Sequence, residues 1–201
     1  PAGRAEAGDV VAYPVERLGA WVRSEVEPAW LRTPQGALET FLEAGEAERF
    51  DVAARALNLA DLPEDAWPER GPELAEKLYF VLARELAIDW NALPDRPDGA
   101  DDLSQTRPPA DGRRAASVAP SPRRNLLVGS LKGTGRPVEV RLERVQAPNL
   151  PPVWLIARST VARTEALYER YGPGWLQRTA PGRAIEEIAR APISRWLMFV
   201  A

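Results

Sequence analysis

The sequence predicts an α+β fold, in which N-terminal helices pack on a small antiparallel β-sheet, a meander of three strands followed by a short helix. Two patterns carry this prediction. Apolar residues recur at helical spacing in the first half of the chain, whereas residues 138–143 alternate between apolar and charged side chains, as in a half-buried strand. Residues 153–157 are apolar throughout, which predicts a central strand covered on both faces.

The first 30 residues are predicted to form an N-terminal helical extension. Apolar side chains recur near helical spacing there, interrupted by Pro14, so we expect a helix at about residues 15–27 that Pro28 closes. The part of the chain before Pro14 is expected to be only loosely attached to this helix.

Three further helices are expected before the sheet. Thr33 and Pro34 form a start signal, a capping hydroxyl followed by proline at the first helical position, for a helix that reaches about residue 44. A second short helix at about residues 50–57 completes a helical hairpin. The strongest helical pattern lies at about residues 72–86, after an irregular connection, because its leucines share one face.

Residues 95–125 are predicted to form a long mobile loop. Residues 95–124 contain five prolines and no aromatic residue, and they offer almost nothing to bury. The three expected strands then follow, at about residues 126–131, 138–145 and 153–157, with Gly133-Thr134-Gly135 as the turn between the first two.

A helix is expected after the last strand. Ser159 or Thr160 can cap it, its length runs from about residue 161 to residue 171, and Gly172-Pro173-Gly174 stops it. We expect the α+β domain as a whole to cover residues 31–180.

The composition limits the chemistry available to the chain. Of 201 residues, 45% are hydrophobic and 27% are charged, which is typical of a globular chain and argues against general disorder. The formal net charge of −3 gives no reason to expect a nucleic acid partner. Histidine and cysteine are both absent, which removes the commonest general base and all thiolate metal sites. We therefore expect no catalytic residue, no metal site and no cofactor.

Asp89 and Trp90 are the candidate ligand-binding residues. Trp90 lies just beyond the strongest predicted helix, where an aromatic side chain could line a pocket, and Asp89 beside it could supply a polar contact. The alternative is that Trp90, like the other tryptophans, has a structural role in the core or at a corner.

The end of the chain carries the longest uninterrupted apolar run in the sequence, residues 196–201. One interpretation is a terminal helix or strand that docks on the core. The other is that residues 181–201 form a membrane-proximal connector and the start of a transmembrane helix. Arg195 and Trp196 would then lie at the level of the lipid headgroups, where such residues collect.

Five segments, in this order, resemble a known family. They are residues 33–44 (TPQGALETFLEA), 61–63 (DLP), 71–99 (GPELAEKLYFVLARELAIDWNALPDRPDG), 138–145 (VEVRLERV) and 153–176 (VWLIARSTVARTEALYERYGPGWL). The combination resembles the extracytoplasmic N-terminal domain that precedes the membrane helices in a subgroup of small-conductance mechanosensitive channel (MscS-like) proteins. The resemblance covers most of residues 33–176, and residues 88–99 and 161–175 are its most specific parts.

The resemblance implies a domain at the periplasmic face of the cell membrane, within a homo-oligomeric channel whose lipid-contacting segment follows the C-terminus. The expected function is a non-enzymatic role in assembly or gating. Two alternatives remain open from the residues. One is a module that senses or binds a cell-envelope ligand in a pocket between helices and sheet. The other is a small α+β enzyme, which would need a buried carboxylate in a cleft.

Overall fold

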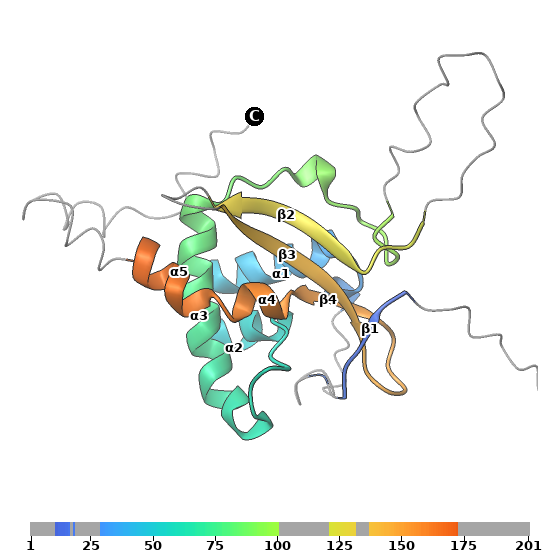
Figure 1. Cartoon of the computed structure of the whole chain (residues 1–201), viewed down its shortest axis with the longest axis horizontal. Helices are drawn as coiled ribbons and strands as arrows, with labels where there is room; N and C mark the ends of the chain where they lie inside the picture. The colour runs from blue at the N-terminus through green and yellow to red at the C-terminus, as the bar shows by residue number, and fades with distance from the viewer. Residues whose placement is uncertain (1–10, 17, 19–28, 101–120, 132–136, 173–201) are drawn as a thin grey trace, which may run out of the picture.

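The computed structural model describes residues 11–16, 18, 29–100, 121–131 and 137–172, and it has an α+β fold (Figure 1). Helices pack on a small mixed sheet of four strands. The Gly133 to Gly135 turn, most of the helix expected at residues 15–27, and the C-terminal residues with Arg195 and Trp196 lie outside the described residues.

The sheet is built around one long strand. Its strands are β1 (Tyr13–Pro14), β2 (Asn125–Leu131), β3 (Val138–Gln146) and β4 (Val153–Ile156). Leu142 of β3 pairs with both Leu126 of β2 and Ile156 of β4, so β2 and β4 are antiparallel to β3 on its opposite edges. Tyr13 pairs in parallel with Val145, which makes the sheet mixed.

Strand β1 was not expected from the sequence, which predicted an antiparallel sheet of three strands with a helix from residue 15. The amide of Val15 instead donates a 3.0 Å hydrogen bond to the carbonyl of Gln146, continuing the pairing of β1 with β3. The predicted start of the helix is therefore wrong. A strand of two residues is too short to show the alternation of apolar and polar side chains that identifies a strand, and it contains Pro14. It forms only because the edge of β3 offers a pairing partner.

The prediction that residues 153–157 form the central strand is wrong, although their burial is confirmed. All four residues of β4 are buried, yet β3 occupies the centre of the sheet. The other edge of β4 is covered by a non-sheet segment: Leu57 forms a parallel bridge with Ile156, and the Asn58 amide donates to the Ile156 carbonyl at 3.0 Å. A continuous apolar run indicates burial on both faces, but it does not say which strand is central.

The first two helices follow the sequence signals closely. Helix α1 (Pro34–Glu46) begins as predicted, and the Thr33 hydroxyl accepts a 3.1 Å hydrogen bond from the Gly36 amide. The second predicted helix is split into α2 (Phe50–Ala53) and a 3₁₀ turn, η3 (Ala54–Ala56). Just before α1, another 3₁₀ turn forms η2 (Ala29–Arg32).

Helix α3 (Trp67–Glu85) begins five residues before the predicted start at Pro72, which lies inside the helix. A 3₁₀ turn, η4 (Glu64–Ala66), leads into it. Trp67 is buried, and its indole nitrogen donates a 3.0 Å hydrogen bond to the Leu62 carbonyl, which anchors the first turn. Pro68 and Pro72 are both compatible with the start of a helix, and only the packing of Trp67 selects the earlier one.

The helix expected at residues 161–171 is two helices, α4 (Arg158–Val161) and α5 (Thr164–Tyr171). Neither begins with a side-chain cap, so the predicted capping role of Ser159 or Thr160 is wrong. Thr160 is fully buried, and its hydroxyl instead accepts a 3.2 Å hydrogen bond from the Arg141 amide of β3. Helix α4 thus continues the covering of the β3 edge beyond the end of β4.

The helices and the sheet share one core. Figure 1 shows α1 behind the sheet and α5 crossing α3 beside it, and α2 packs on α1 and α3. The largest completely buried side chains of this core are Trp154, Phe41, Leu31, Leu38, Leu78, Leu82, Leu131, Leu142 and Ile156. They come from η2, α1, α3 and three strands, so the core joins both halves of the chain.

The predicted mobile loop at residues 95–125 is ordered at both ends. The segment after α3 forms a short 3₁₀ turn, η5 (Trp90–Ala92), and runs on to Ala100. The amide of Arg123 donates a 2.9 Å hydrogen bond to the carbonyl of Asp98, so the two ends of the loop lie side by side. Residues 101–120 lie outside the described residues.

Candidate functional site

The two candidate ligand-binding residues, Asp89 and Trp90, are adjacent and both exposed, with 37% of Trp90 accessible. The carboxylate of Asp89 accepts a 3.1 Å hydrogen bond from the Asn91 amide, which caps η5. The structure therefore gives Asp89 a local structural role and leaves the Trp90 indole at the surface.

A pocket of about 370 Å³ lies elsewhere, beside β1. Its lining comes from the β1 region and from the turn that follows β3, namely Ala12, Pro14, Val15, Gln146, Ala147, Pro148 and Asn149. Neither Asp89 nor Trp90 belongs to this lining, and none of the described residues that form it is charged. The pocket is therefore not the one that the ligand-binding alternative expects.

Glu143 is a buried carboxylate that the sequence pattern assigned to the solvent-facing side of a strand. Only 7% of it is exposed. Its Oε1 accepts hydrogen bonds from the Asn58 side-chain amide at 2.5 Å and from the Arg158 backbone amide at 2.8 Å. The carboxylate thus joins three parts of the chain: the segment after η3, the strand β3 and the first residue of α4.

Asn58, the side-chain partner of Glu143, is itself buried and hydrogen-bonded through both its amide nitrogen and its amide oxygen. Asn58 is 6% exposed, and its Oδ1 accepts a 3.0 Å hydrogen bond from the amide of Ala60. A carboxylate held in this way stabilises the fold, because leaving it unpaired in the interior would be costly. The sequence held one signal of this role, the break in alternation at Glu143-Arg144, where two charged residues follow each other in a strand.

Asp98 and Arg144 form a second polar centre near the ordered ends of the loop. Burial alone would raise the pKa of Asp98, but hydrogen bonds from Arg96 and from the Ala100 amide outweigh it and lower the pKa. Burial lowers the pKa of Arg144, and the negative charge of Asp98 opposes this shift. The Arg144 guanidinium also donates a 3.3 Å hydrogen bond to the Val11 carbonyl, which ties the residues just before β1 to β3.

Trp154 connects these loop ends to the sheet. It is completely buried, and its indole Nε1 donates a 3.0 Å hydrogen bond to the Pro97 carbonyl. Gly99 has a φ of +65°, and a Cβ on it would lie 2.4 Å from the Trp154 Cζ2 atom. Only glycine allows both this backbone conformation and such a close approach to the indole ring.

The hydrogen bonds of these centres link segments of the chain that lie far apart in the sequence. The buried carboxylate of Glu143 lies in hydrogen bonds to an amide side chain and a backbone N–H, and neither can act as a nucleophile or a base beside it. Among the residues that the structure describes, no group of three or more acidic side chains is placed to hold a metal ion.

Comparison of the chain with protein-family models, with curated proteins and with solved structures finds no match. Within the described ranges, none of the helices combines the length and the apolar character that crossing a membrane requires.

Proposed function

We propose that the chain is a non-enzymatic extracytoplasmic domain of a homo-oligomeric mechanosensitive channel of the MscS-like family. It would lie at the periplasmic face of the cell membrane, with the lipid-contacting segment following it in the chain. Its role would be to support assembly or to bias gating.

The contact between Trp154 and the Pro97-to-Gly99 turn is the observation that carries the proposal. The turn ends the segment 88–99, one of the two most specific parts of the resemblance, and Trp154 lies near the start of the last matching segment. Although 57 residues separate Trp154 from Pro97, the indole ring packs against the turn. The residues that carry the resemblance therefore build the fold, which is what a structural or regulatory domain requires.

The role of Glu143 supports the same proposal against the enzyme alternative. That alternative needs a buried carboxylate that is available to a substrate. Glu143 is buried, but its Oε1 already binds the Asn58 side chain and the Arg158 amide. A carboxylate with these partners links separate elements of the fold. A structural role of this kind is all that the proposal requires of Glu143.

A domain outside the bilayer can influence a tension-gated pore only in one way. It must make contacts whose free energy differs between the closed and the open states, because contacts that are equal in both shift no equilibrium. Tension would act on the membrane helices, and the domain would raise or lower the tension at which they open.

The first test is the reading frame beyond Ala201. A continuation with several apolar stretches of about 20 residues each would support the proposal. A frame without such a stretch would overturn it.

The second test uses the full-length protein in liposomes, with and without residues 33–176. We expect the deletion to change the tension threshold or the oligomeric state, measured by patch recording and by native mass spectrometry. A deletion that leaves threshold, conductance and assembly unchanged would remove both proposed roles.

A further inference from the structure

Helix α5 packs on α3 and the core through Leu167, with Tyr168 and Tyr171 only partly buried beside it. Only two of its eight residues, Thr164 and Leu167, are buried. The Thr164 hydroxyl is buried without a hydrogen-bond partner among the described residues, which weakens the attachment. Tyr168 adds an edge-on contact with the Phe80 ring of α3, with 5.8 Å between the ring centroids.

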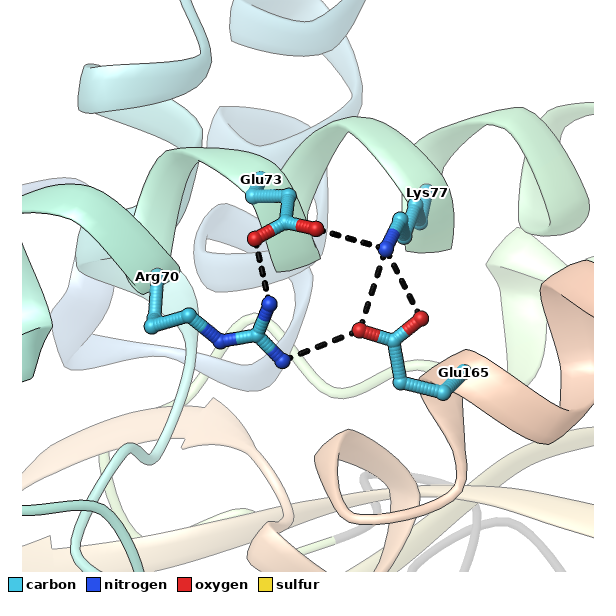
Figure 2. A network of polar contacts seen from close by, with 4 residues as sticks. All are labelled: Arg70, Glu73, Lys77 and Glu165. Atoms are coloured by element: carbon cyan, nitrogen blue, oxygen red, sulfur yellow. Dashed lines mark hydrogen bonds and ion pairs between the residues drawn. The ribbon is translucent and has the colours of Figure 1, made fainter.

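A ring of four charged side chains joins α5 to α3 beside these contacts (Figure 2). Lys77 Nζ lies 2.7 Å from Glu73 Oε1 and 2.7 Å from Glu165 Oε2. Arg70 donates to the same two carboxylates, to Glu73 through Nη1 and to Glu165 through Nη2 at 3.0 Å. Each cation therefore binds both anions. We call these four residues the charge ring.

The charge ring is asymmetric, because three of its members belong to α3 and only Glu165 belongs to α5. Without Glu165, two cations on α3 would face a single carboxylate. The hydrogen bonds with Lys77 are the main cause that lowers the pKa of both Glu73 and Glu165. Those between Lys77 and Glu165 are likewise the main cause that raises the pKa of Lys77. The ring thus favours the charged form of all three groups.

Solvent and salt reach the charge ring. Between 21% and 45% of each of its side chains is exposed. The screening length falls from about 10 Å in 0.1 M salt to about 3 Å in 1 M salt, so added salt weakens such pairs. The contacts between α1 and β4 are apolar and carry no comparable sensitivity.

We propose that α5 is a salt-sensitive latch. The charge ring holds α5 against α3, and screening of the ring lets α5 open while the core stays folded. The chain continues beyond residue 172 directly from α5, so this opening changes how firmly the following segment is connected to the domain. The inference concerns the 201-residue chain itself and does not require the proposed channel function.

Hydrogen exchange of the 201-residue chain, measured by mass spectrometry, tests the latch. Exchange of the α5 amides is compared with that of the α1 amides, in about 0.05 M and about 1 M sodium chloride. In the wild-type chain we expect high salt to speed α5 exchange about two-fold relative to α1, as the loss of about 0.5 kcal/mol from exposed ion pairs would give. Equal rates in both salts, or α5 exchanging in step with α1, would overturn the proposal.

Three variants separate the charge ring from other effects. Glu165→Gln should speed α5 exchange in low salt and abolish the salt response. This variant also removes a favourable charge from the first turn of α5, so Arg70→Gln on α3 provides the decisive comparison. Lys77 is less suitable because its ammonium also lies over the Tyr168 ring of α5. We expect Arg70→Gln to speed α5 exchange as well, although it leaves α5 unaltered. If it does not, the ring does not hold α5. Glu76→Gln removes an exposed charge from the same helix and should behave like the wild type.

Discussion

The indole Nε1 of Trp154 donates a 3.0 Å hydrogen bond to the carbonyl oxygen of Pro97, and this bond fastens the segment after α3 to the sheet. Leu93 and Ala100 are buried on either side of this bond, whereas Asp95 and Pro97 between them are exposed. The buried indole thus adds an anchor in the middle of a segment that its composition marks as mobile.

Replacing Trp154 with phenylalanine should destabilise the domain by about 1 to 3 kcal/mol. The change removes the donor to the Pro97 carbonyl and leaves a gap in the core. Urea unfolding measures the loss of free energy. Trp90→Phe is the matched control, and because Trp90 is 37% exposed it should change stability by less than about 0.5 kcal/mol. Equal effects at the two positions would contradict the role given to Trp154.

Gly99→Ala should cost about 2 kcal/mol or more, because it adds the strain of a positive φ to a clash with the indole ring. A double-mutant cycle with Trp154→Phe separates the two causes, since the smaller ring does not reach as far as Cζ2. The cost of Gly99→Ala should be lower in the Trp154→Phe background. An unchanged cost would show that backbone strain alone is responsible.

Asn58→Asp should destabilise the domain by about 2 kcal/mol or more at neutral pH, because it places a second carboxylate beside the buried Glu143. The loss should shrink as the pH falls and the carboxyl introduced at position 58 takes up a proton. Asn91→Asp at an exposed position is the control and should change little at any pH. Unfolding curves at several pH values distinguish the two variants.

The charge ring makes a pH-dependent contribution to stability. The lowered pKa values of Glu73 and Glu165 mean that their contribution is complete above the ordinary carboxyl value of 4.5 and is lost as the pH falls below it. Because both side chains are more than 40% exposed, we expect at most about 0.5 kcal/mol. The stability difference between wild type and Glu165→Gln at pH 7 should therefore disappear at about pH 3. If the stability difference between wild type and Glu165→Gln persists in acid, its cause is packing and not charge.

The candidate site shows the limit of reading one sequence. The residue types of Asp89 and Trp90 and their place after a helix predict a ligand contact, and the structure places both on the surface. Glu143 was assigned to solvent by the alternation of β3, but its partner Asn58 lies 85 residues away and cannot be found from local spacing. Buried polar pairs of this kind form only where the tertiary structure brings two distant segments into contact.

The sequence by itself determined the α+β class, the start of α1 at the Thr33 cap and the positions of β2, β3 and β4. These depend on side-chain periodicity and local hydrogen bonds, which act within a few residues. Only the tertiary structure decided that β3 is central, that β1 joins it in parallel, and that Trp154 holds the loop at Pro97. Those features arise from contacts between distant segments, where burial of apolar surface outweighs local preference.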